Sequence, residues 1–261
     1  MQSNDLENAA RALRRARSSC LPIAPISKTH GIASIDDAYA IAAINTRARI
    51  AQGARAIGKK IGLTSRAVQS QLGVDQPDFG ILLDDMEFGN DSEIPTHRLM
   101  QPKVEAEIAF VVAHDLPGAH APSWGEFLAC LGTALPAIEI VDSAIADWKI
   151  TLFDTVADNA SSGLFVVGDQ PVQIASVQLA DVAMQMQVNS ETVSRGTGEA
   201  CLDHPLRAAF WLARTMVARG VPLRAGEIIL SGALGPMAAV KLGDSVEANF
   251  GAFGRVACRF G

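Results

Sequence analysis

Hydrophobic and polar positions along the first 55 residues follow the period of an α-helix. Apolar side chains recur at helical spacing over residues 4–19, which predicts a first helix. The two prolines within residues 21–26 end it, because proline lacks a backbone donor and fixes φ. A second helix is predicted from Ser34, whose hydroxyl can cap the free amides with Asp37 three residues later, to Gly53. A solvated face is expected for the arginines of the first helix, Arg11, Arg14, Arg15 and Arg17.

From residue 56 onward the pattern favours strands. Over residues 103–110 apolar side chains alternate with Glu105 and Glu107, a period of two that predicts a half-buried strand. A second apolar run at residues 135–141 predicts another strand, and a helix capped by Ser123 joins the two. The other expected elements are strands within residues 54–64, 81–83, 164–167, 182–188 and 226–236, helices at 65–72 and 203–219, and a hairpin at 244–260. The chain is thus predicted to have a helical N-terminal part, residues 1–55, and a strand-rich domain, residues 56–261.

Composition and charge exclude several classes of protein. With 49% hydrophobic and 19% charged residues, the chain has the composition of a globular protein rather than a disordered one. Its net charge of −6 and the lack of a polybasic patch argue against nucleic acid as the main partner. The N-terminus lacks the pattern of a secretory signal, and the apolar runs are shorter than the roughly 20 residues that cross a bilayer. We therefore expect a soluble cytoplasmic protein without a membrane partner.

Three acidic residues within apolar strands need a physical explanation. Side chains two positions apart on a strand point to the same face, so Glu105 and Glu107 are predicted neighbours, and Glu139 lies inside the second apolar run. At about 5 Å and an effective dielectric constant near 20, two carboxylates repel each other by roughly 3 kcal/mol. A shared proton or a shared hard divalent cation would offset this repulsion. Alternatively, Glu105 and Glu107 lie on the solvent-facing side of an ordinary amphipathic strand.

Two polar regions could contribute to the same site. Lys60 lies at the end of the strand predicted within residues 54–64 and precedes a turn-rich loop at 74–80, so it could lie at the mouth of a site or on the surface. Residues 142–163 form a polar, irregular segment, which suits either a substrate-lining loop or a series of turns. Neither the four cysteines nor His114 and His120 have the spacing of a metal site.

Seven ordered blocks cover nearly the whole chain and carry a resemblance to a known family. The blocks are Lys60-Ile-Gly-Leu-Thr64, Leu72-Gly-Val-Asp-Gln-Pro-Asp-Phe-Gly80, Gln101-Pro-Lys-Val-Glu-Ala-Glu-Ile-Ala109, Leu135-Pro-Ala-Ile-Glu-Ile-Val141, Asp154-Thr-Val-Ala-Asp-Asn-Ala-Ser161, His204-Pro-Leu206 and Leu230-Ser-Gly-Ala-Leu-Gly-Pro-Met237. In this order they resemble the 2-hydroxypenta-2,4-dienoate (2-keto-4-pentenoate) hydratases. These enzymes belong, with the 4-oxalocrotonate decarboxylases, to the fumarylacetoacetate-hydrolase-like superfamily. The last block is more similar to the hydratases.

The resemblance implies a fold, an assembly and a set of site residues. The implied fold is α+β, a mixed, strongly coiled β-sheet roll with flanking helices, in a chain that assembles as a homo-oligomer. The implied ligands of a divalent metal, Mg²⁺ or Mn²⁺, are Glu105, Glu107 and Glu139. The implied catalytic residues are Lys60 and Asp78. Substrate binding is implied for Leu72, Phe79, Ser161 and Ser231, although Phe79 also suits a packing role.

The implied reaction is the hydration of 2-hydroxypenta-2,4-dienoate (2-oxopent-4-enoate) to 4-hydroxy-2-oxopentanoate, in the meta-cleavage degradation of aromatic compounds. The metal would polarise the C2 oxygen of the 2-oxo acid, and Lys60 and Asp78 would move protons. Because desolvation disfavours the charged form of a lysine, we expect a lowered pKa for Lys60. Two alternatives stay open, a 4-oxalocrotonate (2-oxo-3-hexenedioate) decarboxylase and a non-catalytic binding partner of such an enzyme. Other enzymes of the same pathway are candidate partners.

Overall fold

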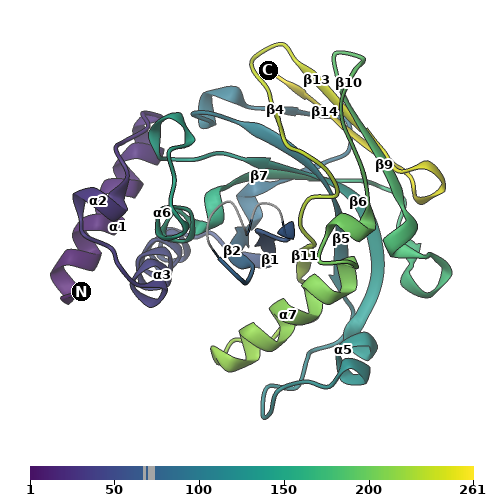
Figure 1. Cartoon of the computed structure of the whole chain (residues 1–261), viewed down its shortest axis with the longest axis horizontal. Coiled ribbons are helices and arrows are strands. Elements are labelled where there is room, and N and C mark those ends of the chain that lie inside the picture. Colours follow the sequence, from purple (N-terminus) through teal and green to yellow (C-terminus); the bar gives the residue numbers. More distant parts are fainter. Residues whose placement is uncertain (67–68, 70–73) are drawn as a thin grey trace.

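A computed structural model describes residues 1–66, 69 and 74–261, and its N-terminal part is helical, as the pattern predicts. The helices there are α1 (Ser3–Ser19), α2 (Ile26–Thr29) and α3 (Ile35–Ala51). Ser34 begins α3 as expected, because its hydroxyl accepts a hydrogen bond from the backbone N–H of Asp37 at 3.1 Å. Figure 1 shows these helices grouped to one side of the strands. The helix predicted at residues 65–72 falls largely outside the described residues.

A fourth helix, α6 (Leu152–Ala157), joins this helical layer from the segment predicted to be irregular. That prediction is wrong for these six residues, which Thr151 caps by accepting the backbone N–H of Asp154 at 3.4 Å. A hydrophobic core separate from that of the sheets joins α6 to the N-terminal helices, and its fully buried members include Leu13, Ile26, Ile41, Ile145 and Val156. The helical layer therefore includes residues far from the N-terminus. The domain boundary at residue 55 stays a prediction.

Arg17 departs from the solvated face that is predicted for the arginines of α1. Its guanidinium contacts the carboxylates of Asp142 and Asp158 at 3.1 and 2.8 Å, and both carboxylates are buried. Asp158 also accepts the backbone N–H of Ala144 at 2.7 Å. Because removal of one partner would leave a buried charge uncompensated, this cluster ties α1 firmly to residues 142–158.

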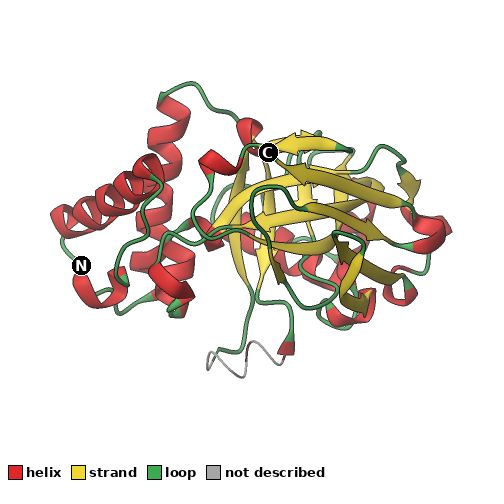
Figure 2. Ribbon diagram, turned by 90° about the horizontal axis from the view of Figure 1, so that it is seen from above, coloured by secondary structure: helices red, strands yellow, loops and turns green. Residues whose placement is uncertain are grey.

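Two sheets form the larger part of the chain (Figure 2). The nine-stranded sheet has the order β2-β1-β11-β5-β6-β7-β3, with β12 paired to β5 and β8 paired to β6. Its strands are β1 (Ala56–Gly62), β2 (Asp78–Leu83), β3 (Glu87–Gly89), β5 (Lys103–Val112), β6 (Leu131–Val141), β7 (Ser162–Val167), β8 (Val172–Gln173), β11 (Ile228–Leu230) and β12 (Ala238–Ala239). The five-stranded sheet has the order β10-β9-β13-β14-β4. Its strands are β4 (Ser92–Ile94), β9 (Ala183–Val188), β10 (Glu191–Thr197), β13 (Ser245–Asn249) and β14 (Arg255–Phe260).

Both sheets are mixed, which confirms the expected α+β class. β1 pairs with β11 in parallel, whereas β5 pairs antiparallel with both β11 and β6. Figures 1 and 2 show long, strongly curved strands, with the two sheets lying against each other. One continuous hydrophobic core fills the space that these strands enclose, and its largest fully buried side chains include Phe110, Phe127, Phe165 and Phe260. The curved sheet thus provides a rigid support for side chains on its inner face.

Two further helices, α5 (Trp124–Cys130) and α7 (Pro205–Ala218), flank the strands. α5 begins at the predicted cap, because Ser123 Oγ accepts the backbone N–H of Glu126 while the Glu126 carboxylate accepts that of Ser123. It connects β5 to β6, as the pattern predicts. In the described part of the chain, no helix is both long and apolar enough to cross a membrane.

Candidate active site

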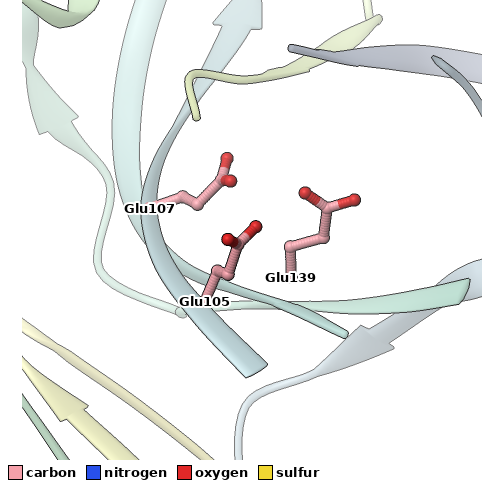
Figure 3. A group of neighbouring side chains, drawn as sticks. All are labelled: Glu105, Glu107 and Glu139. Atoms are coloured by element: carbon pink, nitrogen blue, oxygen red, sulfur yellow. The ribbon is translucent and has the colours of Figure 1, made fainter. Parts of the chain in front are cut away.

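The three glutamates of the predicted metal site come together on one face of the nine-stranded sheet. Glu105 of β5 lies directly opposite Glu139 of β6, and Glu107 follows two residues later on the same face of β5. One ligand oxygen of each carboxylate lies within 4.8 Å of the other two. Figure 3 shows the three carboxylates pointing into a common space. Glu107 is 0% exposed and Glu105 is half-buried, so the alternative that these two glutamates lie on a solvent-facing side of the strand is wrong.

Two oxygens of the buried carboxylates Glu107 and Glu139 have no partner among the described residues. Among the described residues, Glu107 Oε1 and Glu139 Oε2 have no partner, and Glu139 Oε1 has only the ammonium group of Lys60 at 3.0 Å. Glu107 Oε2 accepts the backbone N–H of Gly232 at 2.8 Å. Burial raises the pKa of Glu105 to about 7 and the pKa of Glu107 well above its usual value, and repulsion by Glu139 adds to both shifts. A hard divalent cation takes such oxygens as ligands and offsets their repulsion. The donor set therefore fits a hard divalent cation.

Lys60 and Asp78 reach the same space from β1 and β2. Asp78 lies opposite Gly62, and Lys60 is two residues before Gly62, so both predicted catalytic residues lie on one face. Lys60 Nζ lies 3.0 Å from Glu139 Oε1 in an ion pair between two buried side chains. Burial raises the pKa of Asp78 to about 6, although the positive charge of Lys60 opposes the shift. The structure thus places one cation and one carboxyl group beside the three glutamates.

The expected lowering of the Lys60 pKa is wrong. Burial does act in that direction, but the surrounding carboxylates, led by Glu139 and Asp78, more than offset it and raise the pKa of Lys60 above its ordinary value. Lys60 is therefore held as a cation by the acidic cluster, the form in which a lysine can donate a proton.

A cavity of about 1020 Å³ opens beside these groups. Four of the predicted site residues line it, namely Lys60, Asp78, Glu105 and Ser161. Six lining residues that sequence reasoning missed are Lys103, Trp148, Ile150, Thr155, Arg195 and Met237. A signal for Lys103 was available, because it lies two residues before Glu105 and so on the same face of the strand. The others come from loops, from α6 and from β10, and no local pattern predicts where these elements lie in space.

The polar segment of residues 142–163 contributes five residues to the cavity wall, namely Trp148, Ile150, Thr155, Ala160 and Ser161, and several structural contacts. Ser161 is buried at the cavity, where its hydroxyl lies 3.2 Å from that of Thr155. Asn159 instead binds the edge of β2, because its side-chain amide exchanges two hydrogen bonds with the backbone of Ile81. Residues 159–161 all have left-handed φ angles of 53–57°, a costly conformation for residues other than glycine. These contacts hold Ser161 in place.

The other predicted substrate-binding residues are placed differently. Ser231 is fully buried, and its hydroxyl accepts the backbone N–H of Ile108, the residue that follows Glu107 in β5. Phe79 is not among the described residues that line the cavity, because its ring stacks on that of Tyr39 at a centroid distance of 4.5 Å. Leu72 lies outside the described residues.

Replacement of Glu107 by Gln is expected to stabilise the metal-free protein at alkaline pH. The pKa of Glu107 in the folded state is raised above 4.5, its ordinary value. The folded protein therefore binds more protons than the unfolded chain, and its stability falls as the pH rises from 4.5 through the folded-state pKa. The amide avoids this penalty, and its oxygen can still accept the N–H of Gly232. At pH 8 in chelator, the thermal midpoint of Glu107→Gln should exceed that of the wild type by about 2 °C or more, the shift that roughly 1 kcal/mol produces in a chain of this size.

The difference in thermal midpoint between Glu107→Gln and the wild type should disappear towards pH 5, where the Glu107 carboxyl of the wild type is protonated in the folded state. Glu191→Gln, at an exposed position of β10, serves as the control and should show no such difference. Mg²⁺ should raise the midpoint of the wild type more than that of Glu107→Gln, because a bound ion stabilises the folded state. If Glu107→Gln melted below the wild type at pH 8 in chelator, the carboxylate would not be the uncompensated charge described above.

Comparison with known proteins identifies the family of this chain. The family model for the fumarylacetoacetate (FAA) hydrolase C-terminal domain matches residues 49–260. The chain is 52% identical over 260 residues to a 2-keto-4-pentenoate hydratase of Paraburkholderia xenovorans (strain LB400), covering 100% of this chain and 96% of that protein. It is 42% identical over 257 residues to a 2-hydroxyhexa-2,4-dienoate hydratase of Comamonas testosteroni, covering 98% and 97% of the two chains.

A solved structure is similar over the whole chain as well. The 4-oxalocrotonate decarboxylase from Pseudomonas putida G7, complexed with magnesium and adipate, superposes with a TM-score of 0.93 at 30% identity. The match covers 100% of this chain and 98% of the decarboxylase. The chain therefore belongs to the fumarylacetoacetate hydrolase family, as a relative of the 2-keto-4-pentenoate hydratases within it.

Proposed function

We propose that this protein is a hydro-lyase that adds water to 2-hydroxypenta-2,4-dienoate, or its 2-oxopent-4-enoate tautomer, to give 4-hydroxy-2-oxopentanoate. The observation that carries the proposal is the convergence of three glutamates, two buried and one half-buried, with Lys60 and Asp78 beside one cavity. The identity of 52% to a 2-keto-4-pentenoate hydratase over the whole chain supports the same reaction. We expect the enzyme to act in the meta-cleavage degradation of aromatic compounds.

Glu105, Glu107 and Glu139 are the residues that would hold the divalent cation, with Mg²⁺ or Mn²⁺ as the proposed ion. When bound, such an ion offers open positions to the carboxylate and the C2 oxygen of a 2-oxo acid and stabilises negative charge on that oxygen. The decarboxylase with the similar structure is described in complex with magnesium, which supports this choice. The homo-oligomeric assembly that the family resemblance implies stays a prediction.

Lys60 and Asp78 are proposed to move the protons of the reaction. Ketonisation removes the proton of the 2-hydroxyl group and places a proton on C5, which leaves a double bond between C3 and C4 in conjugation with the ketone. Water then adds its oxygen to C4, and C3 takes up a proton. Lys60 is cationic and can donate, while Asp78, with a pKa raised by burial to about 6, can accept a proton near neutral pH.

A second candidate function is the decarboxylation of 4-oxalocrotonate. The observation that favours it is the TM-score of 0.93 to a 4-oxalocrotonate decarboxylase. Both reactions begin with a 2-oxo acid bound through its carboxylate and C2 oxygen, so the glutamates and Lys60 do not distinguish them. The sequence identity of 30% to the decarboxylase, against 52% to the hydratase, places the hydratase first. A non-catalytic binding role is disfavoured because the acidic and basic groups of the site are all present.

Product analysis with two substrates tests the proposal. Purified protein with Mg²⁺ or Mn²⁺ receives freshly generated 2-hydroxypenta-2,4-dienoate or 4-oxalocrotonate in separate reactions. Loss of dienol absorbance and the appearance of 4-hydroxy-2-oxopentanoate from the first substrate are the expected result, with no CO₂ release from the second. Turnover of 4-oxalocrotonate alone would replace the hydratase with the decarboxylase, and turnover of neither would favour the binding role.

A further inference from the structure

Lys103 is a cation in the cavity that no role described above uses. It begins β5 two residues before Glu105, so Lys103, Glu105 and Glu107 follow one another on the same face of the strand. Its side chain is half-buried and lines the cavity. Among the described residues, its ammonium group has neither a carboxylate partner nor a hydrogen-bond acceptor, in contrast to Lys59 and Lys60, which are both ion-paired.

Trp148 holds this ammonium group in place. Lys103 Nζ lies 4.4 Å from the centroid of the Trp148 ring, a cation–π contact, and Trp148 lines the same cavity. The indole N–H donates to the backbone carbonyl of Gln101 at 3.0 Å, and the Gln101 side chain in turn bonds the carbonyls of Ser143 and Ile145. The ring is thereby fixed between the start of β5 and the segment that follows β6.

The backbone around Trp148 is strained, which indicates that this placement of the ring costs conformational free energy. Asp147 and Trp148 have φ angles of 57° and 55°, in the left-handed region that residues other than glycine seldom adopt. The backbone N–H of Asp147 donates to the side chain of Gln101 at 2.8 Å, which maintains the conformation. Strain of this kind persists where the surrounding structure imposes it and is concentrated at functional sites.

The charge of the site leaves a role for a second cation. Three glutamates around one divalent ion keep a net negative charge, and a bound 2-oxo acid adds another. Lys60 offsets part of this charge, but it is already paired with Glu139. Arg195 also lines the cavity, yet its side chain is exposed on β10. Lys103 is the half-buried cation beside Glu105, and an ammonium group there would bind a carboxylate by charge-assisted hydrogen bonds.

We infer that Lys103, held by Trp148, binds the carboxylate of the 2-oxo acid substrate and orients its carbon chain towards Lys60 and Asp78. The inference rests on the proposed function, since it takes a substrate that is bound through the three glutamates. Lys60 and Asp78 approach from β1 and β2, whereas Lys103 lies beyond Glu105 at the start of β5. A substrate whose C3 to C5 atoms lie beside Lys60 and Asp78 therefore turns its carboxylate end to Lys103.

Calorimetric titration of the Mn²⁺-loaded protein with oxalate, a non-reacting bidentate carboxylate, tests this role without turnover. Lys103→Met keeps the aliphatic stem and removes the charge, and it should weaken oxalate binding by about 10- to 100-fold, the value of a hydrogen bond to a charged group. Lys103→Arg should restore most of the affinity. Lys149→Met, which removes an exposed lysine paired with Asp147 in the same loop, is the matched control and should bind oxalate as the wild type does.

Mn²⁺ affinity separates substrate binding from a structural role. Loss of a positive charge beside Glu105 should leave Mn²⁺ binding unchanged or tighter, while the KM for the dienoate rises and kcat changes less. Unchanged oxalate affinity in Lys103→Met would overturn the inference, as would weaker Mn²⁺ binding that accounts for the oxalate loss, or a loss seen in Arg195→Met instead. Lys103-dependent oxalate binding by a protein that hydrates no dienoate would contradict the proposed function and still support the inference.

Discussion

Glu139→Gln is expected to lose divalent-metal binding and, with it, nearly all hydratase activity. Glu139 lies opposite Glu105, and its Oε2 has no partner among the described residues, so this carboxylate is free to bind a cation between the three glutamates. An amide is a much weaker ligand for a hard cation than a carboxylate. We expect turnover in saturating Mg²⁺ to fall by about 1000-fold, as the loss of several kcal/mol of transition-state stabilisation predicts.

Calorimetric titration with Mn²⁺ checks the cause of this loss. The variant should bind Mn²⁺ far more weakly than the wild type while its circular dichroism spectrum and cooperative melting are retained, because Gln has the shape of Glu. Glu191→Gln removes one carboxylate at an exposed position of β10 and should bind Mn²⁺ and turn over substrate as the wild type does. Wild-type activity of Glu139→Gln in chelated buffer would show that the glutamates hold no catalytic metal.

Lys60→Met is expected to retain the metal and lose the chemical step. Lys60 is buried, paired with Glu139 and next to Asp78, and its raised pKa keeps it protonated and able to donate. Loss of a positioned proton donor typically costs about 10²- to 10⁴-fold in rate, and we expect kcat to fall in this range. Mn²⁺ binding should be unchanged or tighter, because the variant removes a positive charge beside the metal ligands.

The neighbouring lysine provides a matched control. Lys59 is as buried as Lys60, but it points to the other face of β1 and pairs with Glu227. Lys59→Met should therefore lower the thermal midpoint without a comparable loss in kcat. Single-turnover kinetics distinguish the two variants. A normal kcat for Lys60→Met would show that Lys60 has only a structural role. Together, Glu139→Gln and Lys60→Met separate metal binding from proton transfer.

Local patterns predicted the elements that carry the site. The period of two around Glu105 and Glu107 predicts a strand, because alternate side chains of a strand share a face. The structure contains that strand as β5. The caps at Ser34 and Ser123 were predictable for the same reason, because each involves residues only three positions apart. Family resemblance, carried by ordered blocks, then assigned Glu139 and Lys60 to the same site.

Contacts between distant parts of the chain were not predictable in this way. Arg17 fits a solvated helix face by its period, yet it pairs with Asp142 and Asp158, which are more than 120 residues away. Residues 152–157 form a helix whose buried face packs against α2 and α3, so their apolar surface is explained only by helices far away in the sequence. Short segments of this kind depend on tertiary packing more than on their own propensity.

The sequence by itself determined which residue types were available, that the two glutamates share one face of β5, and where the main helices begin. Only the tertiary structure decided that Glu139 faces Glu105, that Lys60 reaches across to Glu139, and that Lys103 and Trp148 line the same cavity. It also reversed the expected shift in the pKa of Lys60, since burial and four nearby carboxylates act in opposite directions. The physical reason is that strand register and electrostatic energies depend on distances through space, which the period of a sequence does not contain.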